Sequence, residues 1–100
     1  MQAYETQLDA FGDQTRRVIL DRLRNGPQPV GELARGFSIS RPAISQHLRI
    51  LKQARLVKDE AVGTRRIYHL DPRGFASLRA YLDSFWDIAL NEFKLKAEEK

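Results

Sequence analysis

The sequence of 100 residues contains no cysteine and only two histidines. The absence of cysteine excludes disulfide bonds and thiolate metal ligands, and it is typical of proteins of the reducing cytosol. No apolar run approaches the ~18 residues that span a bilayer, and the N-terminus lacks the pattern of a signal peptide. We therefore expect a cytoplasmic protein that has no membrane partner and needs no cofactor.

The sequence also lacks the residue patterns of an enzyme. It has no nucleophile paired with a base at a plausible spacing, no phosphate-binding glycine loop and no cluster of metal ligands. Asp83 and Asp87 could share one face of a helix, but acids paired in this way are usually just solvated. We therefore predict a protein that is not an enzyme and that has no metal site.

Positive charge is concentrated in the middle of the chain. The formal net charge is +4, and it is made up of 0 over residues 1–37, +5 over residues 38–73 and −1 over residues 74–100. Such a basic stretch favours a nucleic-acid partner, although charge alone is equally compatible with a solvated basic surface.

The spacing of apolar residues predicts helices and one hairpin within a single domain, 1–100. Helices are expected over residues 4–11, 14–25, 30–37, 41–54 and 75–95. Strands are expected over residues 56–60 and 66–70, joined by a loop that contains Gly63, and residues 71–74 should interrupt the chain before the last helix. The predicted fold class is mainly α with a small β-hairpin, a winged helix-turn-helix of about five helices and a two-stranded wing.

The helix expected over residues 41–54 has the pattern of a DNA-reading helix. Ile44, Leu48 and Leu51 form a stripe at i, i+4 and i+7, while the opposite side is rich in hydrogen-bond donors and contains no acid. In a helix-turn-helix the second helix lies in the major groove, where glutamine can read adenine and arginine can read guanine. An ordinary amphipathic helix with a solvated face is the alternative.

We predict that this helix and the tip of the hairpin contact double-stranded DNA. Arginines beside a flexible glycine suit a narrow minor groove or the DNA backbone, whereas a solubilising turn is the alternative. His47 could be a DNA contact, a pH-sensitive element or a structural residue, and His69 is expected to be structural or merely exposed. The predicted DNA-binding residues are Ser40, Arg41, Pro42, Ala43, Ser45, Gln46, His47, Arg49, Lys52, Gly63, Thr64, Arg65 and Arg66.

Four segments of the chain, residues 11–16, 30–34, 40–51 and 54–57, and a wing with Gly63, two arginines and the run 68–70, carry a family pattern. Together they resemble the ArsR-type family of winged-helix repressors. The resemblance implies repression by blocking a promoter, recognition through residues 40–49 and a dimer built from the first and last helices. Metal-sensing members of this family have cysteines in the short helix or near the N-terminus, or Asp/His sets on the last helix. This sequence has no cysteine and its last helix has no histidine, so we do not expect it to sense arsenic or zinc.

The last helix is expected to form a homodimer interface. Its aromatic stripe would promote aggregation if it stayed exposed, and a symmetric helix–helix contact would bury it. An intramolecular core or a site for an apolar ligand is the alternative. The predicted interface lies on residues 1–11 and 75–95 and consists of Tyr4, Leu8, Phe75, Leu78, Leu82, Phe85, Trp86, Ala89 and Phe93.

These features predict a sequence-specific DNA-binding transcriptional regulator. We expect a homodimeric repressor that binds a near-palindromic operator and lacks the usual metal-sensing site. A winged-helix module that binds proteins and has no specific DNA target is the alternative. The sequence does not indicate an effector ligand.

Overall fold

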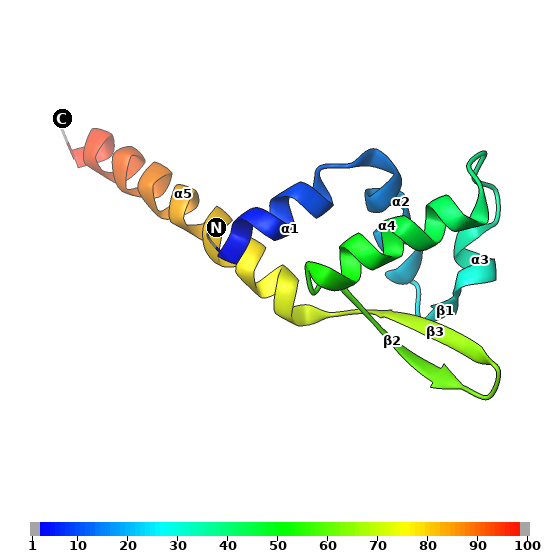
Figure 1. Ribbon diagram of the computed structural model, residues 1–100. Helices are drawn as coiled ribbons and strands as arrows, with labels where there is room; N and C mark the ends of the chain where they lie inside the picture. The colour runs from blue at the N-terminus through cyan, green and yellow to red at the C-terminus, as the bar shows by residue number, and fades with distance from the viewer. Residues whose placement is uncertain (1–2, 99–100) are drawn as a thin grey trace.

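The computed structural model describes residues 3–98 as helices around a small antiparallel sheet (Figure 1). Helices α1 to α4 form the body, the hairpin extends from one side of it, and α5 projects from the other side (Figure 1). The predicted fold class, mainly helical with a wing, is confirmed. In chain order the elements are α1 (Ala3–Phe11), α2 (Gln14–Leu23), β1 (Gln28–Pro29), α3 (Val30–Ala34), α4 (Arg41–Gln53), β2 (Val57–Val62), β3 (Arg65–Leu70) and α5 (Pro72–Glu98).

The hydrophobic core holds α4 against the rest of the body. The predicted stripe of Ile44, Leu48 and Leu51 is at most 1% exposed. It packs with Ile19 of α2 and Leu33 of α3, which are both fully buried. Burial of this one stripe leaves the opposite side of α4 in solvent.

The predicted helix over residues 30–37 is too long, because α3 ends before a turn at Gly36. The φ of Gly36 is +84°, a left-handed conformation that glycine adopts without strain. Arg22 fixes this turn by donating hydrogen bonds to the carbonyls of Leu33 at 2.7 Å and Arg35 at 2.6 Å. Its guanidinium also lies 4.3 Å from the ring centroid of Phe37.

The wing is longer than predicted, and a third strand joins it. Val62 pairs with Arg65, so only Gly63 and Thr64 form the turn, where Gly63 has a φ of +62°. The two-residue strand β1 pairs with β3 on the side away from β2, giving the sheet order β1-β3-β2. A strand this short that includes a proline has no periodicity to detect, and it lies at a sheet edge, where proline is tolerated.

Residues 71–74 begin α5 instead of interrupting the chain. The Asp71 carboxylate accepts the backbone N–H of Arg73 at 3.0 Å, and Pro72 occupies the first helical position, where its missing N–H costs nothing. Gly74 is buried against the turn after α4: a Cβ added there would lie 2.4 Å from the carbonyl oxygen of Arg55. This glycine therefore permits close packing and does not mark a loop.

Helix α1 connects the body to α5. The Tyr4 ring stacks on Tyr81 of α5 with 3.9 Å between centroids, and Gln7 donates to the carbonyl of Ala54 at 2.8 Å, at the end of α4. The second half of α5 projects beyond these contacts (Figure 1). Neither α5 nor any other helix within residues 3–98 combines the length and the apolarity needed to cross a membrane.

Candidate nucleic-acid interface

Helix α4 turns its acid-free side to solvent. Ser40 caps the helix, since its hydroxyl oxygen accepts the backbone N–H of Ala43 at 3.3 Å. The exposed side repeats at i, i+4, i+7 and i+11 from Pro42, and Gln53, which was not among the predicted contacts, ends this row. The exposed residues of the face are Pro42, Ser45, Gln46, Arg49 and Gln53.

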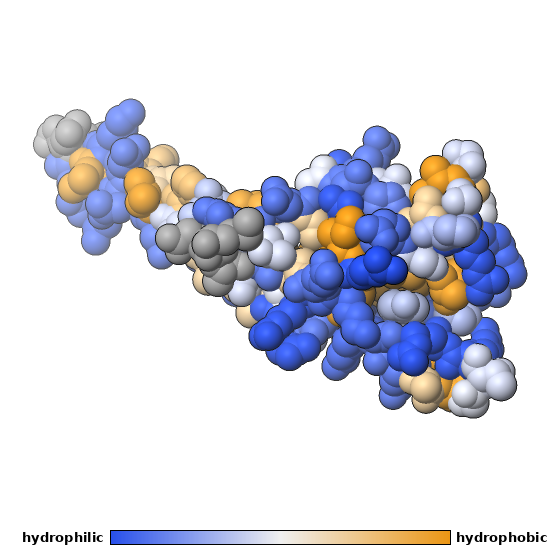
Figure 2. All heavy atoms as spheres, viewed as in Figure 1, coloured by the Kyte–Doolittle hydropathy of each residue, from blue (hydrophilic) through white to orange (hydrophobic). Residues whose placement is uncertain are grey.

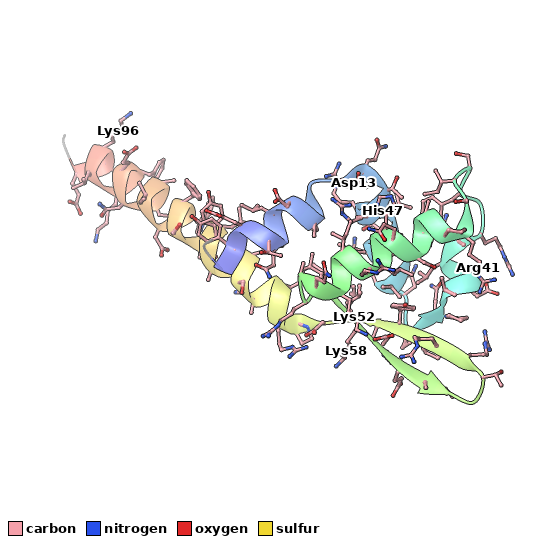
Figure 3. The ribbon with its side chains drawn as sticks, viewed as in Figure 1. Asp13, Arg41, His47, Lys52, Lys58 and Lys96 are labelled. Carbon is pink, nitrogen blue, oxygen red and sulfur yellow. The ribbon has the colours of Figure 1, made fainter. Side chains whose placement is uncertain are left out.

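Arg41 lies where the start of α4 meets the wing (Figure 3). It lines one hollow together with Thr64, Arg65 and Arg66 of the wing and residues 29–32 of β1 and α3. Neither Arg41, Arg49 nor Arg65 forms an ion pair with any residue of the described chain. These three guanidinium groups remain available to neutralise phosphates.

Lys52 and Arg66, also predicted to contact DNA, are both paired with Asp59 of β2. The Lys52 ammonium lies 2.7 Å from one carboxylate oxygen and the Arg66 guanidinium lies 3.0 Å from the other. The Asp59 side chain is only 5% exposed, while those of Lys52 and Arg66 are each 55% exposed. Burial alone would raise the pKa of Asp59, but hydrogen bonds and charge from its two partners outweigh burial and hold that pKa below its ordinary value. The trio, named here the wing clamp, joins α4 to both strands of the wing.

His47 turns away from the exposed face of α4 and toward α2. Its Nδ1 lies 3.3 Å from a guanidinium nitrogen of Arg16 and 3.9 Å from a carboxylate oxygen of Asp13. Figure 3 shows Asp13 and His47 next to each other where α1, α2 and α4 meet. The side chain is 22% exposed, so it is partly buried at the edge of the exposed face of α4.

Arg16 organises this edge. Its Nε donates to the carbonyl of Ala10 at 2.7 Å and its second guanidinium nitrogen donates to the carbonyl of Asp9 at 3.1 Å, both at the end of α1. Its backbone N–H donates to Asp13 at 3.0 Å, and this hydrogen bond is the main reason why the pKa of Asp13 lies below its ordinary value. The Arg16 residue thus links α1, the N-cap of α2 and α4.

Asp59 and Arg16 were not predicted from the sequence. Asp59 could have been suspected, because strand alternation places it on the same side of β2 as the buried Val57, and an acid at an inward position needs a partner. Arg16 ends the segment 11–16 that carries the family pattern, but no local pattern indicates its contact with His47, 31 residues away.

His69, Asp83 and Asp87 each form at most one ion pair within the described residues. His69 lies 2.9 Å from Glu60 within the hairpin. Asp83 is exposed and lies 3.8 Å from Arg79, and Asp87 is exposed. Within residues 3–98 no three side chains of the His, Asp and Glu types converge on one point.

The predicted dimer residues divide into two groups. Leu78 is 7% exposed and belongs to the core of its own chain, and Phe75 packs against that core, so neither offers a full side chain to a partner. Tyr4 is half-buried in its stack on Tyr81, while Leu8 is 37% exposed. The open apolar residues are Leu82, Phe85, Trp86 and Phe93, which are 56–75% exposed, with Ala89 among them, and Figure 2 shows hydrophobic patches along the projecting part of α5.

Known proteins are similar to this chain in sequence and in fold. Residues 13–59 match the family described as bacterial regulatory protein, arsR family. The HTH-type transcriptional regulator Rv2034 of Mycobacterium tuberculosis is 58% identical over 84% of this chain and 78% of its own length. The transcriptional repressor SdpR of Bacillus subtilis is 47% identical over 62% of this chain and 69% of its own length.

Solved structures agree with these relatives. One titled as a possible transcriptional regulator for arsenical resistance superposes with a TM-score of 0.75 at 46% identity, over 94% of this chain and 96% of that chain. An ArsR-like transcriptional regulator from Rhodococcus sp. RHA1 also gives a TM-score of 0.75, at 29% identity, over 98% of this chain and 95% of that chain. The chain therefore belongs to the ArsR family of DNA-binding transcriptional regulators.

Proposed function

We propose that the chain is a homodimeric repressor that reads a near-palindromic operator through α4 and the wing and lacks a metal-sensing site. One observation carries this proposal. The solvent-exposed side of α4 holds amide, hydroxyl and guanidinium groups and no acid, and it is flanked by arginines that no carboxylate neutralises. A surface of this kind suits both base edges and phosphates.

The exposed residues take different roles in this proposal. Gln46, near the start of the exposed face, reads a base edge in the major groove. Arg49, one turn further along, neutralises a phosphate. Arg65 at the end of the wing enters the minor groove or contacts the backbone.

Selection of bound sequences from random double-stranded DNA tests the proposal. The selected site should contain inverted half-sites about one helical turn apart. Gln46→Ala should relax the preference at one position of each half-site, at a cost of about 1–3 kcal/mol for the preferred sequence. Arg49→Ala should weaken binding to all sequences alike, and the matched control Arg24→Ala, which removes an exposed charge from α2, should change neither property. If no sequence is enriched, the chain is an interaction module without a specific DNA target.

The exposed apolar face of α5 supports the dimer. Large apolar side chains projecting into water favour association, and a two-fold contact would place two copies of α4 on successive major-groove faces. Phe85→Glu should yield a monomer in sedimentation experiments, whereas Asn91→Glu, on the side of the same helix opposite Ala89 and Phe93, should leave the dimer intact. A monomeric wild-type protein at micromolar concentration would contradict this part of the proposal.

The contacts of the two histidines support the absence of a metal-sensing site. Nδ1 of His47 faces Arg16, and Nε2 of His69 faces Glu60, on different elements of the chain. The sequence supplies no thiolate to complete a site. We therefore expect operator affinity to be unchanged by Zn²⁺ or by arsenite, and release of the operator by either one would refute this part.

A further inference from the structure

The hydrogen bond between Arg16 and His47 restricts the protonation of the imidazole ring. A guanidinium group has only donors, so a hydrogen bond at 3.3 Å requires Nδ1 to be the acceptor. Asp13 could accept a proton from Nδ1, but at 3.9 Å it lies beyond hydrogen-bond distance. The neutral ring therefore carries its proton on Nε2.

Nε2 is the free end of this ring. No residue of the described chain is bonded to it, and the side chain retains 22% of its exposure. The ring lies on α4, at the edge of the acid-free face, where a DNA backbone would pass if the proposed function holds. A neutral Nε2–H group there is a donor suited to a phosphate oxygen.

Arg16 also fixes where that donor lies. The same guanidinium group donates to the carbonyls of Ala10 and Asp9 at the end of α1, which stacks on α5 through Tyr4. The ring is thus anchored to α1, the helix that joins the DNA-reading body to the projecting α5.

We propose that Arg16 is a positioning residue for DNA binding, which holds His47 as an Nε2–H donor to a DNA phosphate and ties that donor to α1. This inference rests on the proposed function, because it requires a bound duplex. It assigns Arg16 no contact with DNA of its own.

The ring can be tested first without DNA. Two-bond ¹⁵N–¹H correlations in histidine-labelled protein report which ring nitrogen carries the proton, and the chain has only two histidines, so His69→Gln assigns both sets of signals. At a pH where the ring is neutral, we expect Nδ1 of His47 to be unprotonated and Nε2 to be protonated. A ring protonated on Nδ1 would overturn the inference.

Two isosteric variants then separate the two ends of the ring. In His47→Gln the amide nitrogen lies near the place of Nε2 and preserves the outward donor, whereas in His47→Asn the amide oxygen can replace Nδ1 as acceptor but the outward donor is lost. For each half-site, we expect His47→Gln to bind the selected duplex within about threefold of wild type and His47→Asn to bind about tenfold more weakly, the loss of one charge-assisted hydrogen bond from each protomer. Equal affinities of the two variants, or the reverse order, would overturn the inference.

A double-mutant cycle tests the role of Arg16. Arg16→Lys preserves the charge but cannot reach the α1 carbonyls and Nδ1 together, so we expect about a tenfold loss of affinity in the wild-type background. If Arg16 acts through His47, the same change should cost less than threefold in the His47→Asn background, whereas a general folding defect would be additive. Additive losses therefore overturn the inference. A wild-type chain that selects no DNA at all would instead refute the proposed function.

Discussion

Replacing Asp59 by Asn should destabilise the fold and at the same time strengthen binding to non-specific DNA. The carboxylate is 5% exposed and accepts two hydrogen bonds from cations, at 2.7 Å and 3.0 Å. A hydrogen bond to a charged group contributes about 1.5–3 kcal/mol, and each contribution is reduced here because Lys52 and Arg66 are half exposed. Asn still accepts one of the two, so we expect a loss of about 2 kcal/mol in the free energy of unfolding, or about 10 °C in Tm.

The gain in DNA binding follows from the cations that the variant releases. If Arg41, Arg49 and Arg65 each neutralise one phosphate in both protomers, the slope of log K against log salt concentration is about −5. Release of Lys52 and Arg66 in both protomers would bring the slope toward about −9. Fluorescence anisotropy of a labelled random duplex, titrated at several salt concentrations, measures both the slope and the affinity.

Glu60→Gln is the matched control. It removes the same charge from the neighbouring position of β2, but Glu60 is 61% exposed and is paired only with His69. A surface pair of this kind contributes about 0–1 kcal/mol, so stability and salt slope should both stay close to wild type. If Asp59→Asn leaves the free energy of unfolding unchanged, or if both variants steepen the slope equally, the wing clamp does not hold these cations.

Three further outcomes follow from single contacts. Gly74→Ala should lower the free energy of unfolding by about 3 kcal/mol in chemical denaturation, because the added Cβ meets backbone within 2.4 Å. Gly63→Ala should lower it by only about 1 kcal/mol, because Gly63 has a positive φ but open space around it, and equal losses would contradict this. Arg22→Ala should cost about 2 kcal/mol, since it loses two carbonyl contacts and a ring contact, and a loss below 0.5 kcal/mol would refute that role. Hydrogen bonds from Arg73 hold the pKa of Asp71 below its ordinary 3.8, so the stability that Asp71 contributes is complete above that pH and is lost as the pH falls further. Below pH 3.8 the free energy of unfolding of Asp71→Asn should therefore fall less steeply with pH than that of wild type, and equal slopes would contradict this.

The sequence predicts the fold well wherever burial follows one period. The stripe of Ile44, Leu48 and Leu51 locates α4 and its exposed side, since a period of 3.6 residues separates the two faces. The predicted helix boundaries are wrong where a residue typical of loops has a packing role inside a helix. Glycine usually marks a break in a helix, but Gly74 lies within α5 and packs closely against the backbone of Arg55. No local sequence pattern indicates that contact.

The candidate site is predicted only in part, because helix periodicity shows which residues are exposed but not which remote residues they contact. Residue type and helix face identify Gln46 and Arg49 as exposed members of the polar side. They cannot show that Lys52 lies against Asp59, because that pair depends on the angle between α4 and the wing. The position of His47 likewise depends on Arg16, 31 residues away along the chain.

The net charge of a stretch of sequence therefore counts both cations that are free to attract DNA and cations that are paired with acids of the same chain. The +5 of residues 38–73 includes cations whose partners are carboxylates of the same chain: Lys52 and Arg66 with Asp59, and Arg73 with Asp71. The Asp59 pairs join the wing to α4, whereas the Asp71–Arg73 pair lies within the start of α5. We expect that a chain in which both acids were neutral would attract DNA more strongly and position it less well. If α4 and the wing bind DNA as proposed, we expect the acids of the basic stretch to increase specificity by fixing geometry, at the expense of attraction.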